Sequence, residues 1–222
     1  MTPSAREPTV LERALASSDG GRPAAQPLDA LRAARRAWLR RESLDMGGLA
    51  EQLGTSRATL YRWVGDKDRL LSEALWSLAS DTLDQARAQA EASGPDYVAA
   101  VLDWFMGAIA YHPSMRHFLG RDPEYALRIL TSHESTIRAR MKATVEELLA
   151  EQVEAGALIP ALDLDSLSYL IVRIMESFMY SDLIEGAEPD TSKATVAIRI
   201  LLHAGPIPAE AAPSASSTAP HA

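Results

Sequence analysis

The sequence predicts an all-α protein in which a long helix joins an N-terminal three-helix head to a larger helical body. Apolar residues recur at helical spacing through most of the 222 residues, and no stretch alternates as a strand would. Proline and glycine interrupt this pattern where helices should end. The flanks are of low complexity, so we expect a mobile arm over residues 1–27, with at most an amphipathic turn or two, and a disordered tail over 205–222.

Each predicted helix has local start and stop signals. Asp66 and Asp122-Pro123 are caps, Thr131 to Glu134 has capping-box spacing, and Pro113 is a breaker. In the first helix we expect the arginines outward and four residues inward: Leu31, Ala34, Trp38 and Leu39. The signals predict nine or ten helices, over about 28–42, two within 49–64, and over 66–92, 96–111, 114–119, one that starts at 122, one that the Thr131–Glu134 capping box starts and that runs to 155, and over 165–184 and 191–204.

The stretch LAEQLGTSRATLYRW, from Leu49 to Trp63, predicts two short helices around a tight turn. Gly54 ends the first helix, and Thr55 and Ser56 are placed to cap the second. In the second helix we expect Ala58, Leu60 and Val64 inward, and Arg57, Thr59, Tyr61 and Arg62 outward. The outward residue types contact phosphates and base edges, so this unit is typical of a DNA-binding head. A helical hairpin inside any helical domain is the alternative.

Charge and composition support the same division of the chain. The net charge is −8, yet residues 28–63 hold seven Arg and four acidic residues, a net +3. Residues 1–27 are balanced, which leaves −11 on the remaining 159 residues. A basic head on an acidic body suits a protein with one end on DNA, although a solvated arginine face would look the same. With no cysteine, no membrane-length apolar run and no signal-peptide pattern, we expect a cytoplasmic protein.

Thr55 to Leu75, TSRATLYRWVGDKDRLLSEAL, resembles the recognition helix and following linker of the tetracycline-repressor family of bacterial regulators. The order of the remaining helices agrees with that family. RDPEYALRILTS (121–132) and IVRIMESFMYSDLI (171–184) are similar to a subgroup named after quorum-signal lactone degradation. The chain departs from the family at Ala58, where many members have Gly, and at Gly65-Asp66, which replaces Pro-Ser. The link between the first two head helices also lacks the usual Gly-aromatic turn.

The resemblance implies a repressor that leaves its double-stranded DNA operator when a small, mostly apolar effector of lactone or acyl type binds. It implies base contacts from Arg57 and Thr59, phosphate contacts from Tyr61 and Lys67, and further contacts from Ser56 and Arg62. We expect no cofactor and no metal site, and we find no catalytic motif. A helical small-molecule-binding protein or enzyme without a DNA role is the alternative, and another helix-turn-helix class is a second.

The helix predicted over 165–184 has three faces. Two are apolar and must both be covered, so we expect one on the core and one on a second copy, unless both are buried within a monomer. The expected homodimer residues are Leu167, Ile171, Met175, Met179, Val196 and Ile200. The third face is polar and either lines an effector pocket or holds an Arg173–Glu176 pair at the interface rim. The pocket candidates are Trp104, Phe105, Met115, Phe118, Tyr125, Met141, Tyr169, Arg173, Glu176 and Tyr180.

Overall fold

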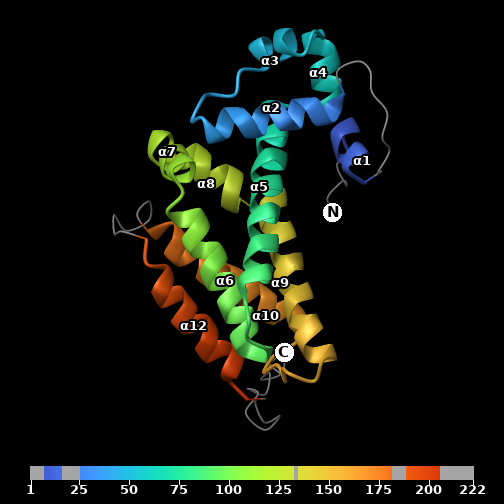
Figure 1. The fold of residues 1–222 in the computed structure, drawn as a ribbon. Coiled ribbons are helices and arrows are strands. Elements are labelled where there is room, and N and C mark those ends of the chain that lie inside the picture. Colours follow the sequence, from blue (N-terminus) through green and yellow to red (C-terminus); the bar gives the residue numbers. More distant parts are fainter. Residues whose placement is uncertain (1–7, 17–25, 133–134, 182–188, 206–222) are drawn as a thin grey trace, which may run out of the picture.

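The computed structural model describes residues 8–16, 26–132, 135–181 and 189–205. Within these ranges every regular element is a helix, which confirms the all-α prediction, and a small head sits on a longer bundle (Figure 1). The eleven helices are α1 (Val10–Ala16), α2 (Pro27–Leu39), α3 (Met46–Gln52), α4 (Arg57–Val64), α5 (Lys67–Gln89), α6 (Gly94–Ala110), α7 (Pro113–Arg121), α8 (Pro123–Thr131), α9 (Thr136–Glu154), α10 (Leu164–Met179) and α12 (Thr191–His203).

Helix α1 lies in the segment expected to be a mobile arm. Thr9 and Glu12 cap it reciprocally, because each side chain accepts a hydrogen bond from the other residue's backbone N–H. Leu11 is completely buried in the core of the head, and Glu12 forms an ion pair with Arg69 of α5 at 3.3 Å. Part of the N-terminal segment is therefore folded onto the head. The tail from residue 206 lies outside the described residues.

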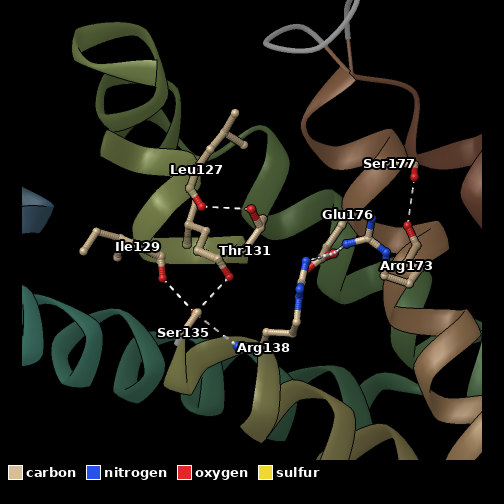
Figure 2. Close-up of polar contacts among 9 residues, drawn as sticks. Leu127, Ile129, Thr131, Ser135, Arg138, Arg173, Glu176 and Ser177 are labelled. Atoms are coloured by element: carbon tan, nitrogen blue, oxygen red, sulfur yellow. Dashed lines mark hydrogen bonds and ion pairs between the residues drawn. The ribbon is translucent and has the colours of Figure 1, made fainter. Parts of the chain in front are cut away.

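Several local expectations need correction. Leu39 is 46% exposed, because α2 ends at this residue. Ala58 is exposed on α4, whereas Leu60 and Val64 are buried as expected. The capping-box spacing is also misleading: Thr131 lies in the last turn of α8, and Ser135 caps α9 by accepting from the Arg138 N–H (Figure 2).

Helix α5 belongs to both cores. Leu70 and Ala74 pack with the head, whereas Leu71 and Leu75 pack with the body. Residues four apart lie above one another on a helix, so these two pairs form neighbouring faces of the same rod. The same helix therefore contributes side chains to both cores.

The body is a bundle in which α6 and α9 pack against the lower part of α5, while α10 packs against α9, and α12 packs against α6 and α10 (Figure 1). Glu73 of α5 is buried, and its carboxylate accepts two hydrogen bonds from Arg140 of α9, at 2.9 and 2.7 Å. The helix predicted over 165–184 is helical as α10 to Met179, and residues 182–188 lie outside the described part. None of the described helices has the length and hydropathy needed to cross a membrane.

Candidate DNA interface and ligand cavities

Two side-chain caps build the helix-turn-helix unit. The Asp45 carboxylate accepts hydrogen bonds from the N–H groups of Gly47 and Gly48, both at 2.9 Å, and these bonds hold its pKa below the usual value. Gly54 has a φ of +62° in the turn, and Ser56 then starts α4 by accepting from the Thr59 N–H at 3.1 Å. The Asp45 cap fixes the start of α3 and the Ser56 cap fixes the start of α4, after the turn.

Helix α4 places most of the expected DNA-contacting residues in solvent. Ser56, Arg57, Tyr61 and Arg62 are exposed, and Thr59 is half-buried. Within the described part of the chain, neither Arg57 nor Arg62 has an ion-pair partner. Lys67, half-buried in the first turn of α5, has none there either. These three cations are therefore not neutralised by an ion pair within the described part of the chain.

Trp63, near the end of α4, is half-buried and packs against the core of the head. The aromatic ring therefore helps to hold α4 in place.

The body encloses a cavity of about 260 Å³, which we call the body cavity. Its walls come mainly from α5, α6, α9 and α10, and the end of α2 closes it toward the head. Six pocket candidates line it: Trp104, Phe105, Met115, Met141, Glu176 and Tyr180. Met175 and Met179, expected at a dimer interface, line it as well. Most of the wall is apolar, which suits a ligand with a mainly hydrocarbon body.

The polar edge of the body cavity is built around Glu176. Its carboxylate accepts two hydrogen bonds from Arg138 of α9, both at 2.9 Å, and one from Arg173 at 2.6 Å (Figure 2). The bonds to Glu176 raise the pKa of Arg138, so this guanidinium stays charged. Glu176 thus pairs with Arg173 and also lines the body cavity. Arg173 and Tyr169 are exposed and do not line the body cavity.

Tyr180 supplies a neutral donor to the same cavity. Burial raises the pKa of its hydroxyl, which therefore remains protonated. No hydrogen bond from this hydroxyl to another described residue is present. A ligand in the cavity that brings an acceptor such as a carbonyl oxygen would give the hydroxyl a partner.

Phe118 and Tyr125 lie elsewhere than expected. They line a second cavity, of about 250 Å³, between α2, the α2–α3 link, the start of α5, α7 and α8. We call it the junction cavity. The Tyr125 hydroxyl donates to Asp68 of α5 at 2.7 Å, and Arg128 donates to the same carboxylate at 3.1 Å. Burial and then the bond to Asp68 raise the pKa of Tyr125, which therefore stays a donor. Sequence reasoning missed this contact because 57 residues separate the partners.

The expected dimer residues fall into two groups. Leu167, Ile171, Met175 and Met179 are buried in the core of a single chain, so they do not form an exposed face. Both apolar faces of α10 are therefore buried against other helices of the same chain. Val196 and Ile200 of α12 are exposed, at 58% and 68%. On α10, which packs beside α12, the exposed large residues are Tyr169 and Leu170.

Comparisons with known proteins agree with this architecture. The family model described as "Tetracyclin repressor-like, C-terminal domain" matches residues 93–203, half of the chain. No curated protein matches. The solved structure of the R. erythropolis transcriptional repressor QsdR from the TetR family is 31% identical, with a TM-score of 0.75, over 82% of this chain and 96% of that one.

Two further solved structures share the fold at lower identity. A TetR-family transcriptional regulator from Rhodococcus sp. is 19% identical, with a TM-score of 0.51, over 78% of this chain and 96% of that one. The fatty acid degradation regulator FadR from Bacillus halodurans is 16% identical, with a TM-score of 0.50, over 82% and 96%. The chain therefore belongs to the TetR family of helix-turn-helix transcriptional regulators, which bind DNA operators and small-molecule effectors as dimers and are not enzymes.

Proposed function

We propose that this regulator is a repressor that a small, mostly apolar effector releases from its operator. The observation that carries the proposal is that Trp38 and Leu39, at the end of head helix α2, form part of the wall of the body cavity. A ligand in the body therefore touches the head directly. The effector binds one arrangement of α2 and α5 more tightly than the arrangement that fits the operator. Operator affinity then falls by the difference between the effector's binding free energies for the two arrangements.

For the DNA contacts we propose the roles that the family resemblance implies. Arg57 and Thr59 read base edges, since a guanidinium can bond a guanine twice and threonine offers a methyl and a hydroxyl group. Tyr61 and Lys67 contact phosphates, and Ser56 and Arg62 make further contacts with the DNA. The exposure of Arg57, Tyr61 and Arg62, and the lack of ion-pair partners for the cations among the described residues, support these roles.

For the effector we propose a lactone or acyl-type molecule. The apolar wall of the body cavity suits an alkyl chain, and the unpaired Tyr180 hydroxyl can donate to one carbonyl oxygen. Trp104, Phe105 and Glu176 complete the proposed site. Tyr169 and Arg173 are too exposed for it, and Phe118 and Tyr125 belong to the junction cavity.

We further propose that α10 and α12 form the homodimer contact, through Val196, Ile200, Leu170 and Tyr169. These four side chains are large, apolar or aromatic, and exposed on two adjacent helices. A twofold contact of this face would present two α4 helices to one duplex, in the cytoplasm where operator DNA lies.

The test is operator binding by fluorescence anisotropy, with DNA from directly upstream of the gene and over a range of salt concentrations. We expect salt-dependent binding that Arg57→Ala weakens, whereas Arg199→Ala, which removes the same charge from α12, leaves it unchanged.

We expect γ-octalactone to release wild-type protein from the operator. Tyr180→Phe should raise the lactone concentration needed about fivefold, the loss of roughly one hydrogen bond, while Tyr169→Phe should not. If operator affinity does not change with salt concentration or with Arg57→Ala, the proposed DNA contacts are refuted.

A further inference from the structure

The junction cavity is separate from the effector site proposed above. Its lining residues come from the end of α2, the α2–α3 link, the start of α5, α7 and α8. Figure 1 shows these elements at the boundary between head and body. Trp38 is the one large side chain that forms part of both cavity walls. Its indole N–H is also the only buried side-chain polar atom in the described residues that lacks a hydrogen-bond partner. A ligand acceptor would satisfy that donor.

The charged groups around the junction cavity favour an anion. Three cations line it, Arg41, Lys67 and Arg121, and none has an ion-pair partner among the residues that the structure describes. Two acids line it as well. Of these, Asp122 caps α8 by accepting from the Tyr125 N–H at 3.1 Å, and Glu42 is exposed, as are Arg41 and Arg121. The cavity thus holds more unpaired positive than negative charge.

Arg41 adds an independent observation, because its backbone is strained. The N–H groups of Glu42 and Arg41 bond the carbonyls of Ala37 and Trp38, a C-terminal helix motif that favours glycine at the position of Arg41. Arg41 has a φ of +62° there, the only positive φ among the described non-glycine residues. A strained arginine in a cavity wall, where glycine would relieve the strain, is typical of a functional position.

The remainder of the wall is suited to a flat or apolar group. Phe118 and Tyr125 meet edge to face, with ring centroids 6.1 Å apart, and Leu71 and Leu44 lie in the same wall. A volume of about 250 Å³ holds only a small molecule. The wall therefore combines an aromatic and aliphatic surface with cations that an ionised group can reach.

We propose that the junction cavity binds a small organic anion with an apolar body, as a second ligand site distinct from the body cavity. Arg41, Arg121 and Lys67 contact the ionised group, and Phe118 and Tyr125 contact the apolar part. If Lys67 also contacts a DNA phosphate, as proposed above, the anion and the operator compete for the same ammonium group. Ligand binding itself does not depend on the DNA role.

The test is a ligand-observed NMR titration of the full chain without DNA, so its failure is distinct from a failure of the proposed DNA contacts. The probes are phenylacetate, phenylacetamide, which has the same shape without the charge, and inorganic phosphate, which has charge without an apolar body. We expect phenylacetate to bind at least fivefold more tightly than either of the others. Equal binding of phenylacetamide or phosphate, or no binding of phenylacetate at millimolar concentration, would overturn the proposal.

Variants then locate the bound probe. Arg41→Gly and Arg121→Gln should each weaken phenylacetate binding at least threefold, and Arg41→Gly should keep or raise the melting temperature, because glycine relieves the strained backbone. Arg36→Gln removes an exposed arginine of α2 that lines neither cavity, so it should leave binding unchanged. Met175→Trp, which fills the body cavity, should also leave it unchanged. Loss of binding in Met175→Trp, with unchanged binding in Arg41→Gly, would place the anion in the body cavity and refute the assignment.

Discussion

The guanidinium of Arg57 lies against the backbone of Gly47. A β-carbon at Gly47 would be 2.2 Å from Nη2 of Arg57, which is a steric clash. Gly47 is in the first turn of α3 and Arg57 is the first residue of α4, so the arginine folds back across the helix-turn-helix unit. The missing side chain at Gly47 therefore sets the resting position of a residue that we propose reads bases.

Replacing Gly47 by alanine should separate stability from DNA recognition. Alanine favours the helix by up to about 1 kcal/mol, and only the flexible end of Arg57 has to move. We expect an unchanged or higher melting temperature and an operator affinity lowered about fivefold, the loss of roughly one contact. Gly120→Ala is the control, because it is also a helical glycine but a β-carbon there meets nothing within 4 Å. Equal operator affinity in both variants would show that the resting position of Arg57 is irrelevant.

The buried ion pair between Glu73 and Arg140 gives a prediction about stability. Arg140→Met removes the partner of a carboxylate that is only 4% exposed, and an unpaired buried charge costs about 3 kcal/mol or more. We expect a large fall in the free energy of unfolding, measured with urea, and a partial recovery when Glu73→Met is added. Lys193→Met, which breaks an exposed pair with Asp190, should cost less than about 1 kcal/mol. A small effect of Arg140→Met would mean that water reaches Glu73 on loss of its partner.

The helices were predictable because their signals are local. Asp66 accepts from the Arg69 N–H at 2.8 Å and starts α5 where the sequence placed the cap. Thr131 was expected to cap the next helix, but it lies in the last turn of α8, and Ser135 caps α9 instead. The helix-turn-helix unit was predictable because its turn, cap and outward cations lie within fifteen residues, whereas the packing of α1 onto the head was not predicted.

The ligand sites were less predictable because tertiary contacts build them. Periodicity showed that α10 needs cover on two sides, but it could not tell a neighbouring helix from a second copy. Met175, for example, was expected at the contact between two copies but lines the body cavity of its own chain. The bond between Arg138 and Glu176 joins residues 38 positions apart and has no local signal. Arg41 and the junction cavity were missed because the strain at Arg41 is visible only in the backbone angles.

The exposed face of α12 gives a prediction about assembly. Ile200→Glu places a charge at the centre of the proposed twofold contact, where it would be buried without a partner, so we expect a monomer in analytical ultracentrifugation. Ile159→Glu is the matched control, because Ile159 is also exposed, at 73%, but lies in the turn before α10. If Ile200→Glu remains dimeric, or if Ile159→Glu dissociates the dimer equally, the contact lies on another face.

Tyr125 gives a prediction about how a ligand signal reaches the head. Helix α8 contributes Leu130 to the wall of the body cavity, and its Tyr125 holds Asp68, next to Lys67 in the first turn of α5. Tyr125→Phe removes this bond, worth about 1 kcal/mol, but leaves the body cavity intact. We therefore expect the same lactone affinity, measured by calorimetry, and a smaller ratio between operator affinities without and with lactone. Tyr97→Phe, at a half-buried tyrosine that lines neither cavity, should keep the wild-type ratio. A wild-type ratio in Tyr125→Phe would show that the signal travels along α2 and α5 without α8, since those helices also border the cavity.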